Sequence, residues 1–595
     1  MRAFGKKFDF MLVPFLFLPL LLIWMQDITV TLYNIDDLYL KTIASGEFTG
    51  VPQAHLVHVG YLTGLLLQGL YTVAPSMPWY GLLLFTYGYL GIYLSLYLVS
   101  AKIRKQRHRI LYFCFWTFIS FAFLWLHLVE LQYTTVTAII CGCGIVCFYL
   151  SEDRQNPKEY LKANLPALLF FFLALELRDK ACIMFFPLIF LIGAVKCIRK
   201  RNMFKSVFAC GVVLLLMTAL VYGINFFAYS DPDWASFDAY NTARENVVDY
   251  NGYPDYEAHR EDYEALGITY DSYVAASSRY QLLLDENINT DFMLRMEELS
   301  NHHSLDIQQM ATSFLNRHTT DYMDRPLNII VYILYFFALL TALCCKNKKA
   351  LWDIVALFGG RMIIWAYLLF VNRPEARVTQ GIYIVEFLLL VAVLFANNLF
   401  GPGIKTEKKR KISRAMFRAL LKKKRFLLQR SLLVLFCAIS VFAGIRWGLP
   451  HIDLIMRYSR ERVDFACAYR EMRTYFYEHE ENLYLVDTNA FTYFTEDAFL
   501  PTMPSKANFV LLGSWTANSP WTDSIAEQFN IDSYETDAIT RDDIYFVFLK
   551  GDNTDHYYLE EYYQSKYPNT YFEQCDTVCA PNGLEFYIMQ VKEER

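Results

Sequence analysis

Two adjacent carboxylates follow the first apolar segment of the chain, and their position suggests a reactive site. Asp36 and Asp37 come shortly after Leu32, where that segment ends. A carboxylate held at a membrane edge can accept a proton from a substrate hydroxyl while a lipid-borne donor lies beside it, and this reach is the first requirement of general-base catalysis. Adjacent carboxylates also repel each other, which raises the pKa of one of them. A solvated helix end is the competing explanation.

Four basic side chains occupy two short turns that we place on the same side of the membrane as the acidic pair. Arg178 and Lys180 belong to the first turn, and Arg373 and Arg377 belong to the second. A departing phosphate develops negative charge, which a preorganised Arg or Lys stabilises without moving a proton. These residues are therefore candidates for binding an anionic leaving group. Snorkelling at helix ends explains them equally well.

Two histidines accompany the stretch 55–73, which we expect to be a helix. His55 and His58 are three residues apart, so both can face one pocket. A divalent metal would need a third ligand, from Asp36 or Asp37, and two histidines alone are a weak metal signature. We therefore predict no metal and no other cofactor, and keep both histidines as substrate-binding candidates.

Further candidates lie in a short loop and near the C-terminus. Glu130 and Tyr133 occupy a loop between two apolar segments and suit hydrogen bonds to substrate hydroxyls, although a solvated loop also accounts for them. Trp515 and Trp521 offer aromatic faces for stacking on a substrate, but packing inside a folded domain is the more common use of tryptophan.

The composition is that of a protein that crosses the bilayer many times. Of 595 residues, 55% are hydrophobic and 17% are aromatic. Basic residues cluster in short loops beside apolar segments, which excludes a nucleic-acid-binding surface. Eleven segments are long enough to span about 30 Å of hydrocarbon: 8–31, 79–100, 110–127, 135–150, 163–177, 181–197, 206–227, 327–345, 351–371, 378–398 and 431–449.

The stretch 55–73 decides which side of the membrane each loop faces. If this stretch crosses the membrane, every later basic loop falls outside the cell. If it lies flat on the outer surface, the loops 102–109, 196–205, 346–349 and 405–430 share the cytoplasm with the N-terminus, as the positive-inside rule requires. We therefore predict a surface helix, and a spanning helix with a Gly-x-x-x-Gly packing face is the alternative. One face of this helix carries small or polar residues: Gly60, Gly64, Gln68 and Thr72.

The same pattern divides the chain into two domains. Residues 1–449 form a membrane domain with an outer loop at 33–78 and a helical outer insertion at 228–325. Residues 450–595 alternate strand and helix patterns, which indicates an extracellular α/β domain. We expect strands at Leu483–Asp487, Phe509–Leu512, Ile544–Leu549 and Glu585–Met589, and helices at Tyr458–Glu480, Pro520–Phe529 and Tyr557–Tyr567.

Cap signals mark the helices of the insertion. Asp231-Pro232 predicts a helix start, Asn251-Gly252 and Gly267 predict helix ends, and Ser304 predicts the N-cap of a further helix. An insertion of this length is too long for a simple connection, so we expect it to cover part of the outer face.

Two pairs of residues give separate structural expectations. Arg361 and Glu386 lie at similar depth in neighbouring antiparallel spans, which predicts a contact between them, either as a structural ion pair or as part of a functional site. Cys575 and Cys579 lie in the polar C-terminal domain, where a local disulfide and two free thiols are equally compatible with their spacing.

These features together resemble the GT-C class of integral-membrane glycosyltransferases, especially poorly characterised members from Gram-positive bacteria. Asp36-Asp37 followed by His55-Leu-Val-His58 is similar to the acidic motif and juxtamembrane helix of that class. The class often has Asp-Glu, and the resemblance implies that Asp36, which matches the first position, is the general base. It also implies a polyprenyl-phosphate sugar donor, a glycan or lipid-linked acceptor, and an inverting transfer at the outer face of the bacterial plasma membrane.

Two other functions fit the same architecture. A polymerase or ligase of lipid-linked glycans also carries a large outer loop, but it relies more on outer-loop arginines than on an acidic pair in the first loop. A transporter or flippase would show inverted repeats and helices broken at mid-membrane. The chain has no internal repeat, and only Gly359-Gly360 hints at a broken helix.

Overall fold

A bundle of long apolar helices makes up the larger part of the molecule. The computed structural model describes residues 28–33, 35–103, 106–279, 281–300, 306–319, 324–397, 412–488, 494–551 and 557–594. Within these ranges eight helices are long and apolar enough to cross a membrane, so the chain is a multi-pass membrane protein. They are α4 (Trp79–Lys102), α7 (Tyr133–Leu150), α8 (Pro157–Ile183), α10 (Phe204–Ala228) with η2 (Arg201–Met203) before it, α16 (Leu327–Cys344), α17 (Lys348–Phe370), α18 (Ala376–Ala396) and the long helix that contains α19 (Ile412–Ala443).

Three of the eleven predicted spans are not among these eight helices. Most of the segment 8–31 lies outside the described residues, and its described end, 28–31, is not helical and runs into a short strand at Thr31–Leu32. The segment 110–127 falls largely in α5 (Gln106–Phe123), whose first turn is polar and basic, followed by the short α6 (Leu126–Val129). The segment 181–197 falls mostly in α9 (Phe186–Arg199), whose 14 residues reach only about 21 Å at 1.5 Å per residue. The total of eleven spans therefore stays a prediction.

Burial separates the middle of the bundle from its lipid-facing edge. Helices α7 and α18 are buried on nearly all sides, whereas α10 is exposed along most of its length. Large apolar side chains cover that exposed face: Phe204, Phe208, Leu215, Leu216, Leu220, Phe226 and Phe227. A helix with this pattern faces the hydrocarbon of the bilayer.

The stretch 55–73 contains a helix, as predicted, but the helix is shorter than expected. It is α3 (Tyr61–Val73), and its 13 residues reach about 20 Å, too short to cross the bilayer. The expectation that the helix begins at His55 is wrong, because residues 55–60 form an irregular segment and Val57 has a φ of +58°. Gly64 of α3 packs directly on Ala54, the residue before this segment, since an added Cβ there would lie 1.9 Å from the Ala54 backbone oxygen.

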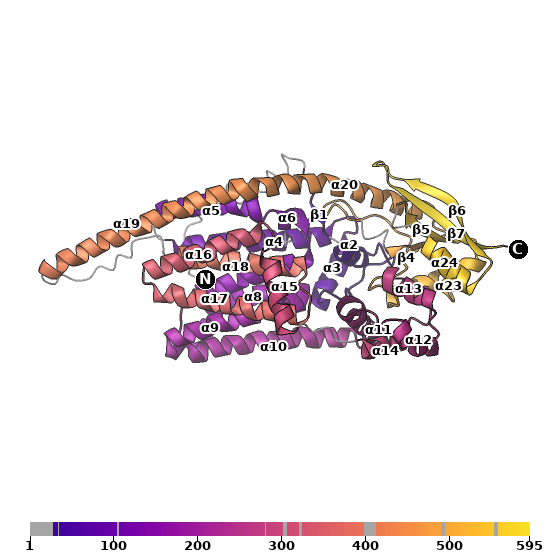
Figure 1. Ribbon diagram of the computed structural model, residues 1–595, viewed down its shortest axis with the longest axis horizontal. Coiled ribbons are helices and arrows are strands. Elements are labelled where there is room, and N and C mark those ends of the chain that lie inside the picture. The colour runs from indigo at the N-terminus through magenta and orange to yellow at the C-terminus, as the bar shows by residue number, and fades with distance from the viewer. Residues whose placement is uncertain are drawn as a thin grey trace.

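The acidic pair is held by a short helix between the bundle and the C-terminal domain (Figure 1). The strand β1 (Thr31–Leu32) pairs in parallel with β2 (Glu130–Leu131). The helix α2 (Ile35–Ser45) follows, with Asp36 and Asp37 in its first turn, where the helix dipole favours negative charge. The backbone of β1 also bonds to the C-terminal domain, since the Leu32 N–H donates to the Glu496 carbonyl oxygen at 3.0 Å.

The insertion after α10 is helical, as expected. It contains α11 (Pro232–Arg244), η3 (Glu245–Asn251), η4 (Glu257–His259), α12 (Arg260–Ala265), α13 (Tyr270–Arg279), α14 (Thr290–Leu299) and α15 (Ile307–Thr319). The predicted ends at Gly252 and Gly267 are confirmed, and both glycines have positive φ. Ser304 lies outside the described residues. Figure 1 shows α11 to α14 at the same end of the bundle as the C-terminal sheet.

One long helix joins the bundle to the C-terminal domain. Helix α19, the π-helical segment η5 (Gly444–Gly448) and α20 (Leu449–Glu478) follow one another without a break. Figure 1 shows this helix running along the bundle and ending beside the sheet. The predicted span 431–449 and the predicted helix Tyr458–Glu480 are thus parts of one helix, which passes through the position where we expected the domain boundary.

The C-terminal domain is an α/β fold with one mixed sheet. Its strand order is β4-β3-β5-β7-β6, with β3, β4 and β5 parallel and β7 antiparallel to both β5 and β6. The elements are β3 (Leu483–Val486), β4 (Phe509–Leu511), α22 (Pro520–Phe529), α23 (Tyr534–Thr540), β5 (Ile544–Leu549), α24 (Tyr557–Lys566), β6 (Thr570–Cys579) and β7 (Glu585–Glu593). All four predicted strands are present, and the edge strand β6 and the helix α23 were not predicted.

The two C-terminal cysteines do not form a disulfide. Cys575 and Cys579 both lie on β6, both are exposed and both are free. Four residues along a strand correspond to about 13 Å, roughly twice the largest Cα separation that a disulfide bridges. The possibility of a local bridge is therefore excluded by the extended backbone between them.

Candidate active site

A cavity of about 690 Å³ lies where the bundle, the insertion and the C-terminal domain meet. Residues from the first loop, the ends of several membrane helices, the η3 segment and the C-terminal domain line it. Seven of the ten predicted site residues are among them: Asp36, His58, Tyr133, Arg178, Lys180, Arg373 and Arg377. The other three, Asp37, His55 and Glu130, are not lining residues.

Asp36 is the acidic residue that faces the cavity. One oxygen of its carboxylate accepts a hydrogen bond from the Arg377 guanidinium at 2.6 Å. Burial alone would raise the pKa of Asp36, but the positive charges of Arg377 and Arg178 outweigh burial and hold that pKa below its usual value. Asp36 is therefore ionised and able to accept a proton.

Asp37 is turned away from the cavity and is fully buried. Its carboxyl accepts hydrogen bonds from the Tyr80 hydroxyl at 2.9 Å and from the Tyr133 backbone N–H at 3.1 Å. Burial, which these bonds only partly offset, raises the pKa of Asp37 well above its usual value, and the neighbouring charge of Asp36 acts in the same direction. The two adjacent carboxyl groups therefore differ in protonation, with Asp37 the one that takes up a proton more readily.

Arg178 reaches the cavity because α8 breaks at this residue. Its backbone is extended, with φ −160° and ψ 101°, so the predicted turn exists as a kink inside α8. The guanidinium lies over the ring of Tyr133, with 4.5 Å between Cζ and the ring centroid. One terminal nitrogen, Nη1, is buried and has no hydrogen-bond partner among the described residues. An anion in the cavity would supply the missing acceptor.

The other two predicted cations pair with acidic residues of the insertion. Lys180 lies 3.0 Å from the Glu245 carboxylate, and Arg373 lies 3.6 Å from Asp249. Arg244 also lines the cavity and reaches Asp249 at 3.6 Å. The sequence analysis missed the insertion residues, because charged residues in an acidic, helical region look like a solvated face and no spacing connects them to the distant membrane helices.

His58 enters the cavity on the irregular segment before α3. Its ring lies 4.9 Å from the ring of Trp515, in an edge-to-face arrangement. Burial, together with the charge of Arg178, lowers the pKa of His58 to about 3, so the imidazole is neutral. No group of three or more His, Cys, Asp or Glu residues suited to a metal occurs in the described part of the chain.

His55 and Glu130, both predicted to bind substrate, do not line the cavity and pair with other parts of the protein. His55 stacks on Trp234 with 4.4 Å between ring centroids and contacts the Ala228 carbonyl oxygen at 3.1 Å. Glu130 is buried and pairs with Arg462 of α20 at 3.2 Å. Both side chains hold neighbouring segments together. The π-stack and the ion pair form across distances in the sequence that no local pattern reveals.

The predicted intramembrane contact between Arg361 and Glu386 is confirmed. The carboxylate also accepts from the Tyr335 hydroxyl at 2.6 Å, and the guanidinium contacts the His318 Nε2 atom at 2.8 Å. Neither Arg361 nor Glu386 lines the cavity. This arrangement fits a structural ion pair whose hydrogen-bonding capacity is filled by its neighbours.

One side of the cavity wall is apolar. It is formed by end segments of α8, α9, α10, α17 and α18, with lining residues that include Ile183, Met184, Pro187, Ile363, Ile364, Leu368 and Val371. Tyr367 of α17 also lines the cavity and is exposed on the bundle surface. A ligand with a charged head and an apolar tail matches a cavity with cations on one part of its wall and hydrocarbon on another.

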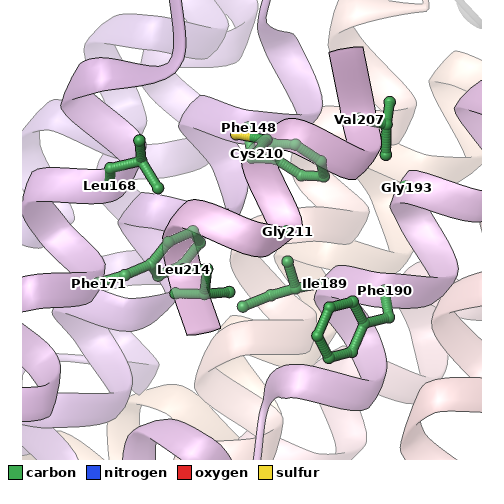
Figure 2. A pocket seen from close by; sticks show the side chains of 10 residues that line it. All are labelled: Phe148, Leu168, Phe171, Ile189, Phe190, Gly193, Val207, Cys210, Gly211 and Leu214. Carbon is green, nitrogen blue, oxygen red and sulfur yellow. The ribbon is translucent and has the colours of Figure 1, made fainter. Parts of the chain in front are cut away.

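A second, much smaller pocket lies deeper in the bundle. Figure 2 shows its lining side chains, which come from α7, α8, α9 and α10 and are apolar apart from Cys210. Its volume of about 40 Å³ admits only a few atoms. It offers neither charge nor hydrogen-bond donors, so the larger cavity is the candidate active site.

No protein-family model and no curated protein matches the chain. Two solved structures are similar to it, both of ArnT from Cupriavidus metallidurans, and each similarity covers 97% of this chain and 97% of that chain. The structure bound to undecaprenyl phosphate has 11% sequence identity and a TM-score of 0.45, and the apo structure has 13% and 0.46. ArnT is a GT-C glycosyltransferase, the class that the sequence resembles.

Proposed function

We propose that this protein is an inverting membrane glycosyltransferase that moves a sugar from a polyprenyl-phosphate donor to a cell-envelope acceptor. One observation carries the proposal: an ionised carboxylate, Asp36, and the four predicted cations come from distant parts of the chain and line one cavity with an apolar wall. A base, a phosphate site and a lipid site together are the groups that this transfer requires.

The phosphate of the donor lies near Arg178 and Arg377 in this proposal. Arg178 has a buried nitrogen without a partner among the described residues, and Arg377 also binds Asp36. The polyprenyl chain follows the apolar wall along α17, past Ile363 and Tyr367. Guanidinium groups stabilise the negative charge that grows on the phosphate as it departs, so the mechanism needs no divalent cation.

The transfer begins at the hydroxyl of the acceptor. Its proton passes to the Asp36 carboxylate while its oxygen attacks the anomeric carbon from the face opposite the phosphate. The bond between that carbon and the phosphate oxygen breaks, and its electron pair leaves with polyprenyl phosphate. A bound phosphate also accepts hydrogen bonds from Arg377, which weakens the hold of Arg377 on Asp36 and makes Asp36 a stronger base.

Asp37 acts as a positioning residue in this mechanism. It accepts one bond from α4 through Tyr80 and one from the start of α7 through Tyr133. These bonds fix the first turn of α2 and therefore the direction of Asp36. Asp36, the first residue of the pair, is the general base.

The proposed location is the outer face of a bacterial plasma membrane, with the N-terminus in the cytoplasm. The basic loops 196–205 and 346–349 lie at the opposite ends of α10 and α17 from the cavity residues Tyr222 and Tyr367. The positive-inside rule therefore supports a cytoplasmic position for those loops and an outer position for the cavity, the insertion and the C-terminal domain.

The test is sugar transfer by purified protein from a panel of undecaprenyl-phosphate-linked sugars, with the anomeric configuration of the product read by NMR. We expect transfer with inversion by the wild type and a loss of about 10²- to 10⁴-fold in Asp36→Asn, the usual contribution of a general base. Asp233→Asn, an exposed carboxylate in the first turn of α11, is the control and should retain full activity. Unchanged transfer in both Asp36→Asn and Asp37→Asn would remove the mechanism.

A further inference from the structure

The cavity has an uncharged side as well as a charged one. The cations and carboxylates come from the first loop, the membrane helices and the insertion, whereas the C-terminal domain contributes Thr488, Ser514 and Trp515. These three residues offer hydroxyl and indole N–H groups and carry no charge. The C-terminal domain therefore completes the wall with groups of a different chemistry.

Two of these polar groups have no hydrogen-bond partner within the described ranges. Trp515 and Thr488 are both 5% exposed, and neither the indole Nε1 nor the threonine Oγ1 has a hydrogen-bond partner in the portion of the chain that is described. Buried donors of this kind cost free energy unless a ligand or another group pairs with them. Both sit on residues that line the cavity, so a ligand there is the available partner.

The Trp515 ring already packs against three aromatic rings of the protein, which leaves less of it available for stacking on a ligand. The ring packs edge-to-face against Tyr39, His58 and Trp521, with centroid distances of 5.7, 4.9 and 6.0 Å. The group of Trp515 that we assign to a ligand is therefore the indole N–H. This differs from the stacking role that the sequence suggested for tryptophan.

The backbone is strained on both sides of the contact between His58 and Trp515. Val57 has a φ of +58°, and the His58 N–H donates to the Leu56 carbonyl oxygen at 2.6 Å, which closes a γ-turn around a β-branched residue. Ser514 has a φ of +76°. Such conformations persist only where the surrounding structure enforces them, and they concentrate at ligand sites.

We infer that Thr488, Ser514, Trp515 and the ring of His58 form the subsite for the sugar ring of the donor. Uncharged hydrogen-bond donors and acceptors match the hydroxyl groups of a sugar. They offer no charge that would favour a charged ligand at this place. The inference rests on the proposed function. With the phosphate held by Arg178 and Arg377, at the ends of membrane helices, the attached ring extends away from the membrane towards the C-terminal domain.

The test compares a lipid phosphate without a sugar with two sugar-bearing forms of the same lipid. Binding of undecaprenyl phosphate and of undecaprenyl phosphoglucose and phosphoarabinose is measured on the full-length protein and on Trp515→Phe and Thr488→Val, which remove one donor each and keep the packing. Each variant should weaken the sugar-bearing ligand that the wild type prefers by roughly fivefold, the effect of one neutral hydrogen bond, and leave undecaprenyl phosphate unchanged.

Trp521→Phe is the matched control. Trp521 is also buried, its Nε1 also has no partner among the described residues, and it touches Trp515, but it does not line the cavity. It should bind both ligands like the wild type. Equal weakening of both ligands, no weakening of either, or the same effect from Trp521→Phe would overturn the subsite.

Steady-state kinetics separates the subsite from the proposed function. A rise in the KM for the acceptor with an unchanged KM for the donor would assign these residues to the acceptor and overturn the inference, while the proposed function would stand. Wild-type protein that prefers the sugar-bearing lipid but transfers no sugar would leave the subsite intact and contradict the proposed function.

Discussion

At the scale of single residues, the two carboxyl groups at the start of α2 are chemically unequal. Asp36 contacts Arg377 and faces the cavity, whereas Asp37 is buried and bonded to Tyr80 and Tyr133. Their identity and adjacency predicted a reactive pair. Which one acts as a base depends on the direction of each side chain and on partners from α4, α7 and α18, and these are tertiary contacts that the sequence does not contain.

This inequality predicts different effects of the same chemical change at the two positions. Asp37→Asn keeps an oxygen that accepts from Tyr80 and Tyr133, and an amide resembles a protonated carboxyl group in shape. We expect Asp37→Asn to lower kcat by less than about tenfold, while Asp36→Asn loses about 10²- to 10⁴-fold. Sugar transfer under single-turnover conditions measures both. A larger loss of kcat in Asp37→Asn than in Asp36→Asn would make Asp37 the base.

The pH profile should depend on Arg377. The base is active when Asp36 is ionised, and it is lost as the pH falls through the pKa of Asp36. Arg377 and Arg178 hold that pKa below its usual value in the wild type, so kcat/KM should show no acidic limb from Asp36 near neutral pH. Arg377→Gln removes one of the positive charges that counteract burial. The pKa of Asp36 should therefore rise, and the acidic limb of the kcat/KM profile should move to higher pH.

The control for this profile is Lys180→Gln, which removes a cavity cation that pairs with Glu245 and not with Asp36. The transfer rate of Lys180→Gln should fall because the phosphate binds more weakly. The acidic limb of its kcat/KM profile should stay at the same pH as in the wild type. An unchanged limb in Arg377→Gln, measured from pH 4 to 9, would show that Arg377 does not tune Asp36.

At the scale of elements, the short helix α3 depends on one glycine. The Cβ of an alanine at Gly64 would meet the Ala54 carbonyl oxygen at 1.9 Å, whereas a Cβ at Gly69 in the same helix has nothing within 4 Å. We expect Gly64→Ala to lower the stability by about 1–3 kcal/mol and to reduce activity, because the irregular segment that carries His58 must move.

Gly69→Ala is the matched control, and it should be neutral or stabilising by up to about 1 kcal/mol, since alanine favours the helix. Thermal unfolding of the purified protein in detergent compares the two variants. Equal stability of Gly64→Ala and the wild type would mean that α3 does not pack on residues 54–60 in this way.

Periodicity and composition predicted most elements, and the exceptions have physical reasons. Apolar runs located the membrane helices and four of the five strands of the C-terminal sheet, because burial imposes those patterns. The start of α3 was placed too early because the positive φ of Val57 is enforced by packing and opposes its own preference. The edge strand β6 was missed because most of its side chains are exposed and polar, so no alternation marks it.

At the scale of the whole molecule, the cavity combines elements that are far apart in the sequence. Sequence analysis identified seven of its lining residues through charge at helix ends and an acidic pair. It did not identify Arg244, Glu245 and Asp249, because their role comes from the insertion folding against the end of the bundle. Of the cavity residues from the C-terminal domain, only Trp515 was considered, and then for stacking; Thr488 and Ser514 were not predicted, since they reach the same cavity only through the tertiary fold.

A buried charge cluster joins α2 to the C-terminal domain. Lys41, four residues after Asp37, lies 2.5 Å from Glu47 and 2.6 Å from Glu496, and all three side chains are almost fully buried. Two arginines of α20 complete the cluster, with Arg473 at 3.4 Å from Glu47 and Arg470 at 3.2 Å from Glu496. The cluster fixes the helix that carries the proposed base against the domain that carries the proposed sugar subsite.

Removal of Lys41 should therefore be strongly destabilising. Lys41→Met leaves two buried carboxylates without their shared partner, a change that costs about 3–5 kcal/mol in comparable buried pairs. Lys506→Met, which breaks an exposed ion pair with Glu480 inside the C-terminal domain, is the control and should leave the Tm unchanged. Thermal unfolding monitored by tryptophan fluorescence compares them, and equal Tm values for the two variants would contradict the role of the cluster.

The most direct test of the proposal is a cryo-electron microscopy structure of the wild-type protein with undecaprenyl phosphate. We predict that the phosphate lies in the cavity within hydrogen-bonding distance of the guanidinium groups of Arg178 and Arg377, beside Asp36, with the lipid chain along the apolar face of α17. A phosphate bound outside this cavity, or a lipid that approaches the bundle with Asp36 out of reach of its head group, would contradict it.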